Sequence, residues 1–334
     1  MKTTPVLSAF AICAASIVIA AEPVPPFSGS IERLDPKLDT LIAPEAKIEV
    51  LASGFNWAEG PVWYQGGIVF SDVPENTAFM WKEGQTEAAV FLKPSGATKP
   101  EGGQGSNGLA VDARGNLILC QHGDRRVARL ERDGKFTTLA GRLGDHLFNS
   151  PNDLVVASNG DIFFTDPPYG LKDKASREIE ENGVYHLGKG GVLRMVVKDL
   201  TFPNGIALSP DEKTLFVAVS DPAATRVMAY DLAADGSAAN ARVFFDAQPL
   251  KKPGLKGGCD GMKVDAQGNV WTTGPGGVLV ISKEGKHLGT ILTGQATANC
   301  AWGDDGGTLY VTADMFLLRV KTLVKGAGFR PSRK

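Results

Sequence analysis

Cysteine and histidine are scarce in this sequence, with four of each in 334 residues. Cys13 lies in an N-terminal apolar segment, which leaves Cys120, Cys259 and Cys300. Three cysteines without a Cys-x-x-Cys pair or a His/Cys cluster exclude a disulfide-rich scaffold and a structural zinc site. We therefore expect three buried, small apolar residues, with a single Cys259–Cys300 disulfide as the alternative.

Net charge is also nearly absent, because 35 Lys and Arg face 37 Asp and Glu. The sequence therefore lacks the basic excess of a nucleic-acid-binding protein. A hydrophobic content of 43% with 22% charged residues is ordinary for a globular chain and excludes intrinsic disorder. No stretch after the first 21 residues is apolar enough to span a bilayer. We expect no nucleic-acid partner and a monomer or weak dimer.

The N-terminus has the pattern of a secretory signal peptide. Residues 1–21 contain Lys2, then an apolar run from Val6 to Ile19, then small residues. The run is shorter than the roughly 20 residues of a transmembrane anchor, which is the alternative. We predict cleavage near Ala20 or Ala21, a periplasmic or secreted protein, and no membrane partner after cleavage.

Glycine, in contrast, is abundant: 40 of 334 residues, where about 7% is usual. Many of these glycines lie in turns that precede short apolar β-type runs. Successive runs start 39 to 55 residues apart, at Ile68, Leu117, Ile162, Leu215, Val270 and Leu309. A period of about 40–50 residues with several strands per unit is typical of a β-propeller.

A second series has the same period. One polar residue lies 9 to 11 residues before each run: Glu59, Asn107, Asn152, Asn204, Asp260 and Asn299. The first strand of a propeller blade lines the central channel, so these residues are predicted to form a ring around the axis. Turn chemistry of Asn-Gly and Asp-Gly is the alternative, but Glu59 is not a turn former.

The sixth unit is too short to supply four strands. Residues 47–51 alternate in polarity like a strand, so we predict that they provide its missing outer strand. The predicted fold is all-β, a single six-bladed propeller closed by an N-terminal strand. The predicted segments are a signal peptide (1–21), an irregular lead-in (22–45), the propeller (46–324) and a basic tail (325–334).

The ring has the chemistry of a hard-cation site. Two carboxylates and four amides offer oxygen ligands alone, which favours Ca²⁺ or Mg²⁺ over zinc or copper. Such an ion polarises a carbonyl or phosphoryl oxygen, and Asp260 is placed to serve as both ligand and base. The alternative is a metal ion that only stabilises the channel.

Several motifs in this order identify a family resemblance. Glu59–Trp63, Ser150–Asp153, Phe202–Gly205 and Cys259–Met262 resemble the gluconolactonase / senescence marker protein / luciferin-regenerating-enzyme (SGL) family over about residues 47–320. The bacterial gluconolactonase branch is the most similar, through Gln121–Arg126, Phe164–Gly170, Thr273–Val278 and Ala298–Ala301.

The resemblance implies a divalent metal, commonly Ca²⁺, with Mg²⁺, Zn²⁺ or Mn²⁺ as alternatives. It implies Glu59, Asn204 and Asp260 as ligands and Asp260 as general base. Asn152 matches a position that ligates metal or contacts substrate. The implied reaction is hydrolysis of a small-molecule sugar lactone, such as glucono-1,5-lactone, to the aldonic acid.

Other residues are weaker candidates. Asn107, Asn299, His122 and Arg125 are predicted substrate contacts, against the alternatives of turn caps, a packed histidine and a surface charge. Asp166 ends a predicted strand next to Pro167–Gly170, where it supports the site or an insertion that covers it. A paraoxonase- or organophosphate-hydrolase-like activity and a non-catalytic ligand-binding propeller remain alternative functions, although inward-facing acids argue against the second.

Overall fold

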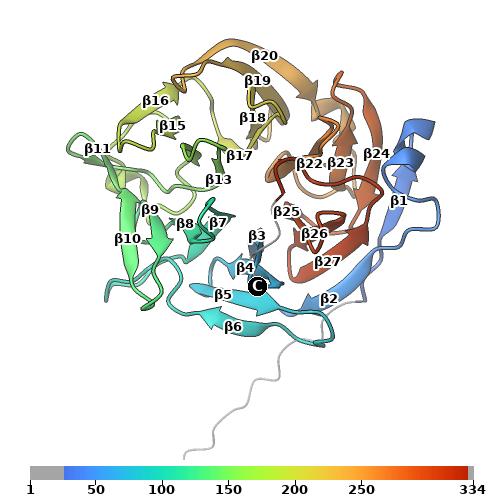
Figure 1. Cartoon of the computed structure of the whole chain (residues 1–334), viewed down its shortest axis with the longest axis horizontal. Coiled ribbons are helices and arrows are strands. Elements are labelled where there is room, and N and C mark those ends of the chain that lie inside the picture. Colours follow the sequence, from blue (N-terminus) through green and yellow to red (C-terminus); the bar gives the residue numbers. More distant parts are fainter. Residues whose placement is uncertain (1–25, 330–334) are drawn as a thin grey trace, which may run out of the picture.

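Six sheets of four or five antiparallel strands surround a common axis, so the molecule is a six-bladed β-propeller, as predicted (Figure 1). The computed structural model describes residues 26–329. The signal peptide predicted for residues 1–21 and the end of the predicted tail lie outside this range. No helix among the described residues is long and apolar enough to cross a membrane.

Strands are numbered along the chain, and each blade runs outward from the axis. Blade 1 contains β3 (Ala58–Tyr64), β4 (Gly67–Asp72), β5 (Thr77–Trp81) and β6 (Ala89–Leu92). Blade 2 contains β7 (Ser106–Val111), β8 (Leu117–Gln121), β9 (Arg126–Leu130) and β10 (Phe136–Ala140). Blade 3 contains β13 (Leu154–Val156), β14 (Ile162–Asp166), β15 (Gly183–Leu187) and β16 (Leu193–Val197). A small ribbon of β11 (Arg142–Leu143) and β12 (His146–Leu147) links blades 2 and 3.

The second half of the ring repeats the pattern. Blade 4 contains β17 (Pro203–Leu208), β18 (Thr214–Val219), β19 (Arg226–Leu232) and β20 (Ala238–Asp246). Blade 5 contains β21 (Met262–Val264), β22 (Val270–Gly274), β23 (Gly277–Ile281), β24 (His287–Leu292) and β1 (Ser30–Arg33). Blade 6 contains β25 (Thr297–Gly303), β26 (Thr308–Ala313), β27 (Phe316–Lys321) and β2 (Glu49–Ser53). Short 3₁₀ helices are η1 (Pro36–Thr40), η2 (Lys174–Ser176) and η3 (Gln248–Leu250).

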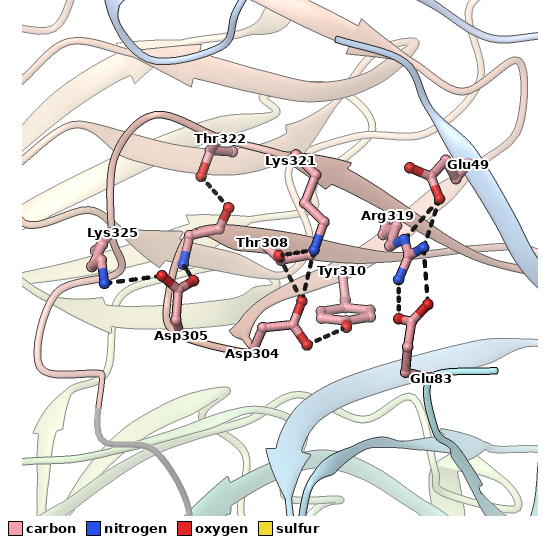
Figure 2. A network of polar contacts seen from close by, with 11 residues as sticks. Glu49, Glu83, Asp304, Asp305, Thr308, Tyr310, Arg319, Lys321, Thr322 and Lys325 are labelled. Carbon is pink, nitrogen blue, oxygen red and sulfur yellow. Dashed lines mark hydrogen bonds and ion pairs between the residues drawn. The ribbon is translucent and has the colours of Figure 1, made fainter.

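Blade 6 is closed by the N-terminal strand, which confirms the predicted closure. β2 pairs antiparallel with β27, with Glu49 opposite Arg319. Figure 2 shows that the Arg319 guanidinium also pairs with Glu83 of blade 1. The guanidinium carbon lies 5.5 Å from the centroid of the Trp81 ring. One side chain therefore joins both ends of the propeller to its first blade.

Within residues 26–45 the lead-in contains a strand and a 3₁₀ helix, so the prediction of an irregular segment was wrong there. β1 adds a fifth strand to blade 5 by pairing with β24, and η1 follows it. Leu38, Leu41 and Ile42 are fully buried against blades 5 and 6. These three apolar residues provide enough burial to order a segment whose prolines and charges suggested otherwise.

Apolar clusters fill the spaces between neighbouring blades, as expected for sheets packed face to face. Cys120, Cys259 and Cys300 are buried in these clusters and free, which confirms the interpretation as small apolar residues. At the start of the predicted tail, Lys325 pairs with Asp305 (Figure 2). Gly326 forms a β-bridge with Asp265.

Candidate active site

The six predicted ring residues lie at the innermost edges of the six blades. β3, β7, β17 and β25 carry Glu59, Asn107, Asn204 and Asn299, while Asn152 and Asp260 lie two residues before β13 and β21. Neighbouring first strands contact one another around the axis (Figure 1). Five of the six side chains are buried, and Asp260 is partly exposed.

Backbone contacts between blades set the positions of these residues. Hydroxyl groups at the ends of second strands donate to carbonyls at the start of the next blade: Ser71 Oγ to Asn107 (2.9 Å) and Thr165 Oγ1 to Asn204 (2.6 Å). Gly205 leaves no room for a side chain, because a Cβ there would lie 2.1 Å from the Asp260 carbonyl oxygen. The ring geometry therefore depends on close approach of adjacent backbones.

Asp153 is a third inward-facing carboxylate, and the sequence reasoning missed it. Its side chain is 1% exposed, and its Oδ2 lies 3.5 Å from Asn299 Nδ2. A signal was present: glycine follows the ring residue in four units, at positions 60, 108, 205 and 261, whereas aspartate follows Asn152. That departure places a charge where other blades have none.

Asn299 links two carboxylates, and its role as a substrate contact stays a prediction. Its Nδ2 donates to Glu59 Oε2 (3.1 Å) and approaches Asp153, while its Oδ1 accepts from the Cys300 N–H (2.9 Å). The backbone at Gly261 packs on this amide so closely that a Cβ there would lie 2.0 Å from Asn299 Cγ. The amide thus helps to position both acids.

Carboxylates from blades 1, 3 and 5 crowd together and disfavour one another's ionisation. Desolvation, followed by the charge of Asp153, raises the pKa of Glu59 to about 7. Desolvation raises the pKa of Asp260 well above its usual range, with added contributions from Glu59 and Asp153. Lys263 is the cation that partly offsets these effects, since its charge lowers the pKa of Glu59 and of Asp153.

The oxygen atoms at the ring fit a hard cation. Among residues 26–329, no group of three or more His, Cys, Asp or Glu side chains forms a metal site on its own. In the same residues, however, Oδ1 of Asn152 and Oδ1 of Asp260 have no hydrogen-bond partner. Buried oxygens without partners beside carboxylates of raised pKa are the arrangement that a bound divalent ion relieves.

His122 and Arg125 lie in the turn between β8 and β9 but point to different surroundings. His122 is buried, its Nδ1 lies 3.0 Å from Gln104 Oε1, and burial lowers its pKa to about 4. Its Nε2 has no partner in the described part of the chain, so its role as a substrate contact stays a prediction. Asn107 Oδ1 is likewise without a partner there.

Arg125 makes its contacts with the connection between blades 2 and 3 and with blade 3 itself, and its role as a substrate contact stays a prediction. Its Nε donates to the Phe148 carbonyl (2.5 Å) and its Nη1 pairs with Glu178 (3.2 Å). The backbone of Arg125 has a positive φ of 55°, a conformation that is uncommon outside glycine. Through its contacts, the side chain joins blades 2 and 3.

Asp166 ends β14, as predicted, and is fully buried. Its Oδ2 accepts from the Asn149 N–H (2.8 Å), while Oδ1 has no partner in residues 26–329. Burial raises its pKa to about 7. Asp166 supports the connection that leads into blade 3.

The comparison with known families decides the relationship, because a family model described as an SMP-30/gluconolactonase/LRE-like region matches residues 57–314. The chain belongs to the SMP-30/gluconolactonase/LRE-like family. The matched range includes all six ring residues and Asp153. The resemblance predicted from the motifs is thereby confirmed.

Named relatives and solved structures can be aligned with most of this chain. A gluconolactonase of Zymomonas mobilis is 36% identical over 312 residues, 89% of this chain and 87% of that protein. The structure of a Xanthomonas campestris gluconolactonase has a TM-score of 0.78 and 31% identity, over 90% of this chain and 98% of that one. Regucalcin of Agrobacterium tumefaciens, a calcium-binding protein, shares the fold (TM-score 0.66, 22% identity, 85% and 99% coverage).

Proposed function

We propose that the protein is a lactone hydrolase that opens a sugar lactone, such as glucono-1,5-lactone, to the aldonic acid. The observation that carries the proposal is the set of carboxylates Glu59, Asp153 and Asp260 at the axis of a propeller of this family. The similarity to gluconolactonases of Zymomonas mobilis and Xanthomonas campestris supports a lactone as the substrate class.

The site is proposed to hold a divalent cation, with Ca²⁺ as the first candidate because all the donors are oxygens. Glu59, Asn152, Asn204 and Asp260 would hold it. When bound, such an ion polarises the lactone carbonyl as a Lewis acid. A protein of the same fold, the regucalcin of Agrobacterium tumefaciens, is a calcium-binding protein, which is in keeping with a divalent metal here.

The side chains prepare these donors. Glu59 is fixed by the Gly60 N–H and by Asn299, each bonded to its Oε2. Asn204 Nδ2 donates to Ser220 Oγ (2.9 Å), which orients the amide and leaves its Oδ1 available as a ligand. The ligand oxygens are thus held in place before anything binds.

Asp260 is proposed to accept a proton from the attacking water at Oδ1, the atom without a partner in the described residues. The water oxygen forms a bond to the carbonyl carbon, and the bond to the ring oxygen breaks. The proton held by Asp260 then passes to the departing ring oxygen. The product is the open hydroxy acid, so water is consumed and no other reactant is needed.

Export to the periplasm or the medium is part of the proposal. The pattern of residues 1–21 supports it. Mass spectrometry of the mature protein identifies its N-terminal residue, which we expect to lie at or just after Ala20 or Ala21. An intact Met1 in the extracytoplasmic fraction would contradict it.

Proton release from glucono-1,5-lactone tests the proposed reaction. We expect turnover that needs added Ca²⁺, that a chelator abolishes, and that Asp260→Asn lowers by about 100-fold or more because ligand and base are lost together. Asp145→Asn, an exposed aspartate in the β11–β12 turn, is the control and should retain activity. Activity indifferent to chelator and to Asp260→Asn would overturn the mechanism. Hydrolysis of an aryl phosphotriester but no lactone would overturn the substrate class.

A further inference from the structure

The connection between β14 and β15 is much longer than its counterparts in the other blades. It spans residues 167–182, whereas the other connections between second and third strands have two to six residues. These connections begin beside the ring, since Glu59 pairs with Ser71 near the end of β4 and Asn299 pairs with Thr312 near the end of β26. Blade 3 therefore places extra chain at the mouth of the candidate site.

The start of this connection is held firmly. Ser150 Oγ donates to the Pro167 carbonyl (2.6 Å) and accepts from the Gly170 N–H (2.8 Å). Gly170 packs against His122 so closely that a Cβ there would lie 2.6 Å from His122 Cβ. The residues on both sides of Tyr169 are thus fixed, and the direction of Tyr169 is fixed with them.

Tyr169 is held over the ring residues of blades 4 and 5. Its ring lies nearly parallel to Phe202, at 14° with centroids 6.0 Å apart, and Phe202 precedes the Pro203–Asn204 pair. Burial and then the charge of Asp260 raise the pKa of Tyr169 to about 12, and its hydroxyl neighbours Ser220 and Asn204. The phenol therefore reaches toward the proposed base and ligand.

Tyr169 is nevertheless partly open to solvent, at 39% exposure. Within residues 26–329, the other exposed large hydrophobic side chains are leucines and valines, so Tyr169 is the one aromatic residue among them. An aromatic ring with a polar tip, fixed by its neighbours and exposed beside catalytic groups, is a typical wall of a small-molecule site.

We propose that Tyr169 is a substrate contact that makes the site select polyhydroxylated six-membered lactones over plain ones. This inference rests on the proposed lactone hydrolase function and specifies its substrate class. The ring face packs on the C–H face of the lactone, and the phenol hydroxyl hydrogen-bonds a sugar hydroxyl. A lactone without hydroxyls offers that phenol no hydrogen bond and gains less from the contact.

Steady-state kinetics on two substrates test this inference. Glucono-1,5-lactone and δ-valerolactone share the six-membered lactone ring and differ in the hydroxyls. We expect Tyr169→Phe to raise KM for gluconolactone about 3- to 10-fold, with kcat and the constants for δ-valerolactone little changed, because one hydrogen bond is lost. Tyr169→Ala should raise KM for gluconolactone by a further factor and reduce the preference between the two lactones.

Tyr64→Phe makes the same chemical change at the far end of β3 and is the matched control. Thermal unfolding of each variant checks that the fold is intact. Tyr169→Phe keeps the aromatic ring, so it still tests the hydroxyl contact if Tyr169→Ala does not fold. If both Tyr169→Phe and Tyr169→Ala prefer gluconolactone over δ-valerolactone to within twofold of the parent, the proposed role of Tyr169 is overturned. The proposed lactone hydrolase function would still stand. A parent chain that hydrolyses neither lactone would overturn the proposed function, and this inference with it.

Discussion

Asp166 shows what burial does to a single carboxyl group in this protein. It is fully buried and has one acceptor oxygen without a partner among residues 26–329, so its charged form is poorly solvated. Its pKa of about 7 in the fold exceeds the ordinary 3.8, which means that the folded state binds the proton more tightly than the unfolded state. Its contribution to stability is complete below about pH 4 and is lost as the pH rises through 7.

We expect the isosteric Asp166→Asn variant to gain stability relative to the parent as the pH rises. Between pH 5 and pH 8 the difference in unfolding free energy should move by about 3 kcal/mol in favour of the variant, since one pKa unit is worth about 1.4 kcal/mol. Urea unfolding at both pH values measures this difference. Parallel changes in the two proteins would show that Asp166 does not titrate in this range.

At the residue scale, sequence periodicity located the ring but not the partners of its members. The recurrence of one polar residue per unit placed all six at the axis. It could not show that the Asn299 amide would contact Glu59 and Asp153, because those contacts join blades that are distant in sequence. Nor could it show the partners of Arg125, since Phe148 and Glu178 lie 23 and 53 residues further along the chain.

At the scale of elements, the first strands are held by close backbone contact as well as by side-chain hydroxyl groups. Gly205 donates its N–H to the Asp260 carbonyl (3.1 Å), and its missing Cβ permits that approach. The neighbouring atoms are backbone and belong to a strand that is itself fixed, so they cannot move away cheaply. The separation of blades 4 and 5 at the ring is therefore set by one glycine.

Gly205→Ala should destabilise the protein by about 1–3 kcal/mol and weaken Ca²⁺ binding, because the added methyl group forces the two blades apart. Gly190→Ala is the control: this glycine is exposed, has no positive φ, and a Cβ added to it would have no heavy atom within 4 Å. Urea unfolding and calcium titration by calorimetry measure both effects. Equal behaviour of the two variants would contradict the argument.

The elements also mark where sequence reasoning was weakest. The starts of the six recurring strands were predicted to within one residue, since turn chemistry and apolar runs are local signals. β1 and η1 were missed because β1 is four residues long and gains its stability from pairing with β24, more than 250 residues away. A non-local partner leaves no periodic trace in so short a segment.

At the scale of the whole molecule, the ring is closed through Arg319. This side chain is 13% exposed, pairs with Glu49 of β2 (2.8 Å) and with Glu83 of blade 1, and lies over Trp81. These contacts connect β27, β2 and β5–β6, which are the elements where the ring would open first. Closure thus depends on a partly buried charge network as well as on β2–β27 pairing.

Replacing Arg319 by Met should lower the free energy of unfolding by about 2 kcal/mol, since two ion pairs and a cation–π contact are lost from a mostly buried position. Arg242→Met is the matched control, because the Arg242–Asp231 pair is exposed and stays within blade 4. Its expected effect is below about 1 kcal/mol. Urea unfolding compares them, and equal losses would assign Arg319 no special part in closure.

The pairing of β2 with β27 also fixes the order in which the protein can be completed. Glu49 and Arg319 are 270 residues apart, so a ribosome delivers one long before the other. Until then β2 has no neighbour and blade 6 lacks its outer strand, which leaves open edges that invite wrong pairing. Contacts of such large sequence separation make folding slow. The nascent propeller is consequently an unclosed arc for most of its synthesis, and it becomes a ring only when the last strand arrives.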